Sequence, residues 1–154
     1  LLFDLQQDQT GEFPFNELTG GARAGEILSM SFSDDMKYLA VSQSSYGIAV
    51  IEMASTRLKT QLEPKDSFGY AFVKFADGSH DLIAVSRSGN ARISSKEFTS
   101  GEEFSIEGCR SAIDMISLSA DNHQIAIGSS EEPDILIGDA LKKDVILLDA
   151  VNND

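Results

Sequence analysis

The amino-acid sequence predicts an all-β fold built from repeated four-stranded antiparallel sheets. Three observations carry this prediction. A hydrophobic pattern recurs along the chain, its segments alternate apolar and small polar residues as strands do, and Gly, Pro and Ser clusters interrupt every helical spacing. Four short strands in each unit of roughly 40 to 45 residues are typical of the blades of a β-propeller. The sequence therefore favours a propeller over a β-sandwich.

The repeat is clearest in the first predicted hairpin of each unit. The segments SFSDDMKYLAVSQS, KFADGSHDLIAVSRS and SLSADNHQIAIGSS align with one another. Their hydrophobic anchors Phe32, Phe75 and Leu118 lie 43 residues apart in both steps. In each segment a turn of Asp, Gly or Asn separates two runs with strand-like alternation. Each unit therefore begins with a β-hairpin.

Two further strands complete each unit. The third segments are YGIAVIEM, GNARISSKE and PDILIGDA, each opened near a Gly or Pro and most of them rich in β-branched residues. The fourth segments are RLKTQLE, EEFSIEG and DVILLDA. The connections between them have turn composition, although ALKKD is also compatible with a helical turn.

The units divide the chain into a half-blade and three blades. The expected divisions are the outer half of a blade at residues 1–18 and whole blades at residues 19–63, 64–107 and 108–154. In the half-blade, Leu1–Leu5 predicts a third strand and Glu12–Leu18 a fourth. About three and a half blades result, whereas a closed propeller needs at least about four. We therefore expect an incomplete ring, either a fragment of a larger propeller or one that other polypeptide completes, because open end strands expose unpaired backbone groups.

Composition excludes several classes of protein. The length of 154 residues suits one domain. The composition, 42% apolar and 24% charged residues, argues against a disordered chain. No apolar run approaches the roughly 20 residues that a membrane-spanning helix needs. A formal net charge of −13 disfavours binding to nucleic acid or to anionic lipid. The single cysteine, Cys109, cannot form an internal disulfide. We expect an intracellular, cytoplasmic protein.

The segment FSDDMKYLAVSQSSYGIAVIEM resembles the core of a WD40 repeat. Residues that match the family pattern in this first unit are Phe32, Ser33, Asp35, Lys37, Leu39 and Ala40. The other two units match it through Phe75, Asp77, Gly78, Ile83 and Ala84, and through Ser119, Asp121, Ile125, Ala126, Gly128 and Ser129. The resemblance covers most of the chain and implies a WD40-like propeller with degenerate repeats.

The departures from the WD40 pattern are also clear. The chain contains no Trp, so the Trp-Asp dipeptide is replaced by Ile51-Glu52, Ser94-Ser95 and Gly138-Asp139. No Gly-His dipeptide opens a blade. The hydrogen-bond network that the resemblance implies is therefore incomplete, and apolar packing between blades has to stabilise the fold.

The residues that could carry chemistry are better explained by turns. Asp34 and Asp35 form an acidic pair, but the equivalent places of the other units also hold turn acids, so we interpret the pair as turn residues that bind backbone amides. His80 and His123 are expected to be exposed turn residues rather than metal ligands. Cys109 is expected to be a buried small residue. We predict no catalytic, metal-binding or cofactor-binding residue and no cofactor, and a small-molecule ligand is not expected.

Loops at the rim of the axial channel are the expected binding surface. Tyr and Arg carry a large share of binding energy at protein interfaces. The candidate protein-binding residues are Tyr46, Tyr70, Arg87, Arg110 and Asp134.

Two functions fit these expectations. The first is a non-catalytic protein–protein interaction scaffold, a propeller segment of a larger protein or complex. Its partners would be other proteins or the remaining blades, not nucleic acid or membrane. The alternative is an accessory or gating propeller of an enzyme, such as a peptidase, whose catalytic part lies outside this chain. The scaffold function is an inference from the fold class.

Overall fold

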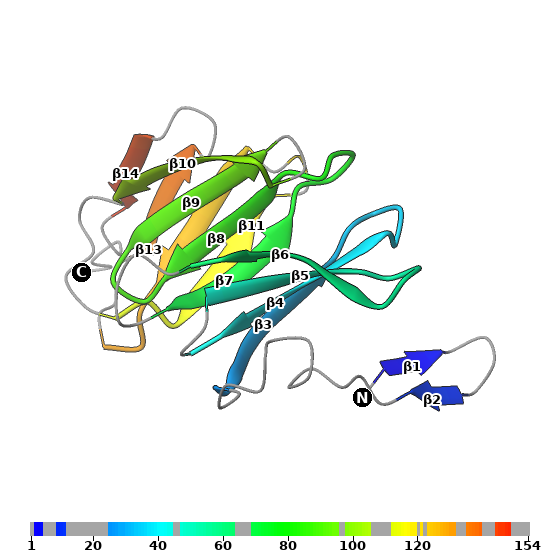
Figure 1. The fold of residues 1–154 in the computed structure, drawn as a ribbon. Coiled ribbons are helices and arrows are strands. Elements are labelled where there is room, and N and C mark those ends of the chain that lie inside the picture. Colours follow the sequence, from blue (N-terminus) through cyan, green and yellow to red (C-terminus); the bar gives the residue numbers. More distant parts are fainter. Residues whose placement is uncertain are drawn as a thin grey trace.

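The structure of the chain is a computed structural model. It describes residues 2–4, 9–11, 25–44, 47–63, 69–95, 98–105, 112–119, 121, 123–131, 135–139 and 144–148. These residues form strands, turns and loops, and among them no helix is long and apolar enough to cross a membrane. The strands form three four-stranded antiparallel sheets and one two-stranded sheet (Figure 1). The prediction of an all-β fold with four-stranded units is confirmed.

Each four-stranded sheet is a simple meander that follows the order of the sequence. Blade 1 consists of β3 (Ile27–Phe32), β4 (Tyr38–Gln43), β5 (Gly47–Glu52) and β6 (Arg57–Leu62). Blade 2 consists of β7 (Tyr70–Phe75), β8 (Leu82–Ser86), β9 (Asn90–Ser95) and β10 (Ser100–Ser105). Blade 3 consists of β11 (Met115–Leu118), β12 (Gln124–Gly128), β13 (Ile135–Asp139) and β14 (Asp144–Leu148).

The two-stranded sheet at the start of the chain differs in part from the expectation. It pairs β1 (Leu2–Asp4) with β2 (Gln9–Gly11), in the register Leu2 to Gly11. The first of these strands lies where the sequence predicts one. The second comes earlier than Glu12–Leu18, which lies outside the described residues. The strand β2 has the sequence QTG, which is short and polar and lacks the apolar residues that predict a strand.

The two faces of each blade point in opposite directions along the stack of three blades. Cross-strand partners share a face, and in blade 1 the register pairs Ser31 with Ala40 and Phe32 with Leu39. We call the side that points toward the following blade the forward face and the opposite side the backward face. The forward face of blade 1 contains Ser29, Ser31, Ala40, Ser42, Ile48 and Val50. Its backward face contains Met30, Phe32, Leu39, Val41 and Ile51.

The same register recurs in the other two blades. Phe75 pairs with Leu82 and Leu118 pairs with Ile125, so these residues are equivalent to Phe32 and Leu39. The backward face of blade 2 contains Val73, Phe75, Leu82 and Ala84, and that of blade 3 contains Ile116, Leu118, Ile125, Ile127 and Leu136. The forward face of blade 3 contains Met115, Ser117, Ala126, Gly128, Ile135 and Ile137.

The hydrophobic core lies between the blades. One cluster joins the forward face of blade 1 to the backward face of blade 2, and a second joins blade 2 to blade 3. Figure 1 shows the three sheets following one another, with β7 beside the strands of blade 1. The strand β4 is buried along its whole length: its forward side packs against blade 2, and Leu39 and Val41 on its backward side cluster with Ile51 and Met53. Alternation is therefore lost on the second strands of blades 1 and 2, which are buried throughout, while β12 at the end of the stack keeps it.

Candidate functional site

The turn between the first two strands has the same backbone closure in all three blades. The amide of Ser33 donates to the carbonyl of Tyr38 at 3.0 Å. Equivalent bonds join Ala76 to Asp81 at 2.9 Å and Ser119 to Gln124 at 2.9 Å. The repeat therefore brings the acidic turn residues of successive blades to the same edge of the stack.

Asp35 organises the turn of blade 1. Its Oδ1 accepts hydrogen bonds from Ser33 Oγ at 2.8 Å and from the amide of Lys37 at 3.0 Å. These bonds, with a smaller contribution from His80, lower the pKa of Asp35 to about 2. Because the carboxylate binds a nearby backbone amide, the interpretation of Asp35 as a turn residue is confirmed.

Asp121 repeats this arrangement in blade 3. Its Oδ1 accepts hydrogen bonds from Ser119 Oγ at 2.5 Å and from the amide of His123 at 3.1 Å. The same two bonds lower the pKa of Asp121, with the serine hydroxyl as the largest cause. The side chain of His123 is exposed, as the sequence predicts.

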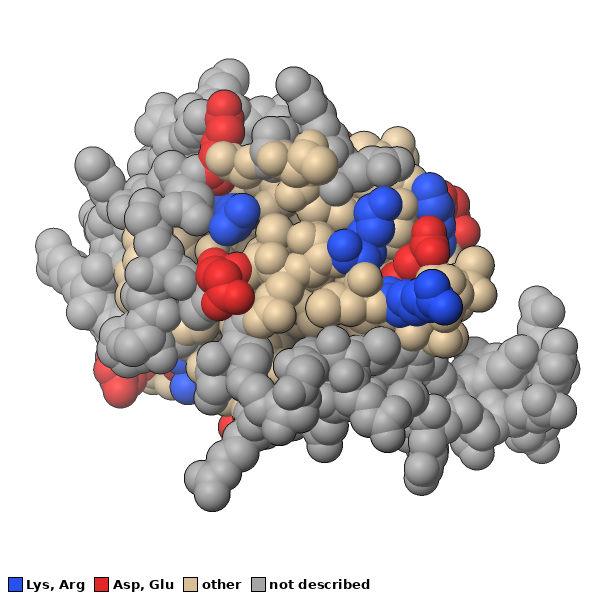
Figure 2. Space-filling model, in the orientation of Figure 1, with Lys and Arg blue, Asp and Glu red and all other residues tan. Residues whose placement is uncertain are grey.

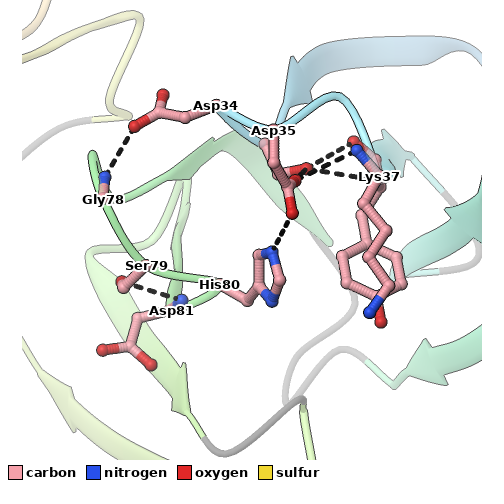
Figure 3. Close-up of polar contacts among 9 residues, drawn as sticks. Asp34, Asp35, Lys37, Gly78, Ser79, His80 and Asp81 are labelled. Atoms are coloured by element: carbon pink, nitrogen blue, oxygen red, sulfur yellow. Dashed lines mark hydrogen bonds and ion pairs between the residues drawn. The ribbon is translucent and has the colours of Figure 1, made fainter.

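Asp34 and His80 connect two blades. Asp34 Oδ2 accepts a hydrogen bond from the amide of Gly78 at 2.6 Å, and His80 Nε2 lies 3.0 Å from Asp35 Oδ2 (Figure 3). The ring of His80 also meets the ring of Tyr38 edge to face at 4.9 Å. The expectation of an exposed turn histidine is therefore only partly right, because His80 keeps 28% of its side-chain surface and lies at a blade junction.

The junction encloses a shallow groove of about 350 Å³. Its lining residues are Asp34, Asp35, Gly78, Ser79 and His80. Ser79 Oγ accepts a hydrogen bond from the amide of Asp81 at 3.1 Å, so this hydroxyl stabilises the turn to which it belongs (Figure 3). Within the described part of the chain, no group of three His, Cys, Asp or Glu side chains is placed to hold a metal ion. The bonds of Asp34 and Asp35 hold the first turn of blade 1 against the first turn of blade 2, which is a structural role.

Serines on β3 form a second connection between blades 1 and 2. Ser31 Oγ accepts the amide of Phe75 at 3.0 Å. Ser29 Oγ accepts the amide of Val73 at 3.3 Å and donates to its carbonyl at 3.4 Å. Sequence reasoning missed these contacts and the bond from Asp34. The available signal was the small polar residue at alternate positions of an otherwise apolar strand.

Two of the five predicted binding residues lie in the described part of the chain. Tyr70 and Arg87 are at the same end of blade 2, since Tyr70 pairs with Ser86. Arg87 is an exposed turn residue, as expected, whereas Tyr70 belongs to β7 and is only 2% exposed. Tyr70 therefore packs in the core between blades 1 and 2 instead of lying in a loop. Its binding role stays a prediction.

Arg87 lies where blades 2 and 3 meet. Its carbonyl accepts the amide of Ile113 at 3.0 Å. The neighbouring Asp114 accepts hydrogen bonds through its Oδ2 from the hydroxyl of Ser130 at 2.5 Å and from the amide of Ser130 at 3.0 Å. These bonds lower the pKa of Asp114, and the charge of Arg87 contributes further. The remaining predicted binding residues, Tyr46, Arg110 and Asp134, and the predicted buried Cys109, are outside the described residues.

The first strands of the three blades line one recess. Its volume is about 330 Å³, and its lining residues are Leu28, Ser29, Ala71, Phe72, Ile113, Asp114, Met115 and Ile116. Contributions from β3, β7 and β11 place the first strand of each blade innermost, around a common centre. This is the arrangement of strands around the axis of a propeller.

Comparison with known proteins identifies the fold. No protein-family model matches the sequence, and no curated protein matches it. The chain is similar to the solved structure of U3-55K, with a TM-score of 0.66, 17% identity, and coverage of 80% of this chain and 37% of that chain. It is equally similar to the crystal structure of RRP9 WD40 repeats, with a TM-score of 0.66, 17% identity, and coverage of 80% and 36%.

The chain thus spans little more than a third of the length of these two structures. At this identity the likeness shows the fold, and it agrees with the four-stranded blades and the inner position of their first strands. The described residues have the fold of an incomplete WD40-like β-propeller, whose blades do not close into a ring.

Proposed function

We propose that this chain is a segment of a non-catalytic protein–protein interaction scaffold, within a larger propeller or complex. One observation carries the proposal: the two end faces of the three-blade stack are exposed at positions that are buried between the blades. A surface of this kind is built to be covered by other polypeptide.

The exposure of equivalent residues differs strongly at the forward end. Ile135 of blade 3 is equivalent to Ile48 of blade 1. Ile48 is 0% exposed and Ile135 is 51% exposed. Met115, on the same forward face as Ile135, is 58% exposed.

The backward end of the stack shows the same contrast. Met30 and Phe32 of blade 1 are 61% and 38% exposed, while their equivalents Val73 and Phe75 of blade 2 are 1% and 2% exposed. The deeper part of this face is different, since Leu39 and Val41 are buried. Among the described residues of this face, the exposed large apolar side chains therefore lie on the first strand of blade 1.

The charge of the chain favours a protein partner. The net charge is −13. On the face seen in Figure 2, the described Lys and Arg side chains lie beside Asp and Glu side chains. This distribution supports neither a nucleic-acid surface nor an anionic membrane as the partner. The gating-propeller alternative predicts the same open faces and differs in what lies outside this chain.

The test measures exposed apolar surface and self-association of the chain. We expect it to bind a hydrophobic dye and to associate with rising concentration in sedimentation experiments. The variant Ile135→Ser should reduce both signals at an unchanged melting temperature, because the residue is exposed. The matched variant Ile48→Ser should unfold the chain, because the equivalent residue is buried. A stable monomer that binds no dye would overturn the proposal.

A further inference from the structure

The forward face of blade 3 has the chemistry of a specific docking site, beyond being apolar. We infer that it receives the first hairpin of a further propeller blade. The hairpin that fits carries two large apolar side chains two residues apart, followed five residues later by a histidine or basic side chain. This inference rests on the proposed function and specifies the partner of one of its open faces.

The contact between blades 1 and 2 supplies the template. Blade 1 offers the hydroxyl of Ser31, which accepts the amide of Phe75 at 3.0 Å. It also offers the carboxylate of Asp35, which lies 3.0 Å from His80 Nε2. Blade 2 therefore presents large side chains at Val73 and Phe75 and an imidazole five residues after Phe75.

Blade 3 repeats the receiving half of that contact. Ser117 is equivalent to Ser31, and Asp121 to Asp35. Asp121 Oδ1 is held by its own turn in the same way as Asp35 Oδ1, which fixes the carboxylate at the edge of the blade. The apolar positions also agree: Ala126 corresponds to Ala40, and Ile135 to Ile48. One element is missing, because Ala120 stands at the place of Asp34.

Blade 2 does not repeat this set, so the recurrence in blade 3 is not a general property of the repeat. Lys74 stands where blade 1 has Ser31, and Gly78 where it has Asp35. The contact between blades 2 and 3 relies instead on an apolar cluster and on the loop bond between Ile113 and Arg87.

The face has space for large side chains. A groove of about 200 Å³ runs over the forward face of blade 3, lined by Met115, Ile116, Ser117, Ala126, Ile127, Gly128 and Ile135. Small residues form its floor, because Gly128 adds no side chain beneath Met115. In blade 1 the equivalent small positions, Ala40 and Ser42, are fully buried. The groove is therefore the uncovered counterpart of a filled contact.

The charge of Asp121 explains why the partner should carry a histidine or a basic side chain. Asp121 is exposed at the end of the stack, as a carboxylate that the turn keeps ionised. A cationic or imidazole side chain placed as His80 is placed in blade 2 would pair with it. The hairpin of blade 1 also has this pattern, at Met30, Phe32 and Lys37. A second copy of the chain is therefore an alternative source of the same chemistry.

The test uses a hairpin of this chain as the probe. A labelled peptide of residues 70–86, cyclised through added terminal cysteines because Tyr70 pairs with Ser86, is titrated against the full 154-residue chain. We expect saturable binding in fluorescence anisotropy. Ala126→Phe should abolish it by filling the groove, and Asp121→Asn should weaken it by about fivefold. The matched control Asp77→Asn, in the turn of blade 2, should leave binding unchanged.

A peptide with His80→Asn completes a double-mutant cycle. It should bind the unchanged chain about fivefold more weakly, and Asp121→Asn should then add no further loss. Self-association that both Phe32→Ser and Ala126→Phe remove would identify a second copy as an occupant of the same site. Absence of peptide binding, or binding that is insensitive to both blade 3 variants, would overturn the inference. The proposed function would survive that result if the open faces still bind the dye.

Discussion

The backward faces of blades 1 and 2 carry nearly the same pattern of residues but meet different surroundings. Phe32 and Phe75 occupy the same place in successive blades, each paired with a leucine on the next strand. Phe75 lies in the core between two blades at 2% exposure, while Phe32 keeps 38% of its surface. The residue and its local structure are alike, so the neighbouring blade alone makes the difference.

This comparison explains how the fold is stabilised without the Trp-Asp pairs of the WD40 pattern. The two larger apolar clusters lie between blades, beside the hydrogen bonds that Asp35 and Asp121 make within their own turns. At the ends of the stack, the large apolar residues of the outermost faces, such as Met30 and Ile135, are exposed, whereas their equivalents between blades are buried. Substitutions should therefore have unequal effects at equivalent positions.

The largest effect on stability is expected at Phe75, the phenylalanine buried between blades 1 and 2. Phe75→Ala should lower the free energy of unfolding by about 3–5 kcal/mol, because it leaves a cavity among Tyr38, Phe98 and the strands around them. Phe32→Ala should cost less than about 1 kcal/mol, since the side chain is partly solvated. Denaturant titrations of both variants measure the difference. Equal losses would mean that the backward face of blade 1 is also sealed in solution.

Glycines at the blade junction should differ through their surroundings. Gly69 and Gly78 both have positive φ, at 64° and 72°, so alanine strains either one by about 1–2 kcal/mol. A Cβ at Gly69 would also lie 3.1 Å from the carbonyl oxygens of Gln43 and Ser44, while nothing lies within 4 Å at Gly78.

Gly69→Ala should therefore lower the melting temperature more than Gly78→Ala does. Thermal unfolding followed by circular dichroism measures both. A smaller loss for Gly69→Ala would show that blade 1 is not held against the start of β7.

A smaller effect is expected from the serines of the forward faces. Ser31→Ala leaves the amide of Phe75 without the hydroxyl that it binds, which should cost about 1–2 kcal/mol. Ser117→Ala, at the equivalent exposed place of blade 3, should change stability by less than about 0.5 kcal/mol. Chemical denaturation of the two variants side by side gives the comparison. If a partner covers blade 3, adding it should make Ser117→Ala costly as well.

The subtlest effect concerns acid stability. The pKa of Asp35 falls from 3.8 to about 2 on folding, so the unfolded chain binds more protons between these values. The stabilisation is complete above about pH 4 and is lost as the pH falls through 2. Asp35→Asn should therefore flatten the fall of the melting temperature in this window. Asp121→Asn should lower the melting temperature at neutral pH less than Asp35→Asn, which also loses the contact with His80.

Local features of the fold were predictable from the sequence because their causes are local. Alternation and turn residues define the hairpins, and the spacing of Phe32, Phe75 and Leu118 defines the blades. The role of Asp35 followed from the preference of Asp for turn amides. The bond from Asp34 to Gly78 did not, because it depends on how one blade is placed against the next.

The candidate binding residues were harder to predict for the same reason. The sequence predicts that Tyr70 lies in a loop at the rim, yet it begins β7 and packs inward. Strand ends depend on pairing, and Tyr70 pairs with Ser86. The sequence predicts an exposed His80, because its hydrogen-bond partner, Asp35, belongs to another blade. Sequence patterns predict the strands and turns within a blade well, but they predict the contacts between neighbouring blades poorly.

The serine contacts of β3 can form only after the following blade has been synthesised. Ser31 and the amide that it binds, that of Phe75, are separated by 44 positions in the sequence. A ribosome that adds roughly 5–20 residues per second needs about 2–9 seconds to supply the second partner. Throughout that delay the forward face of blade 1 lacks the strand that covers it. Translation speed, and any chaperone that shields this face, should therefore govern how much of this protein reaches its native state.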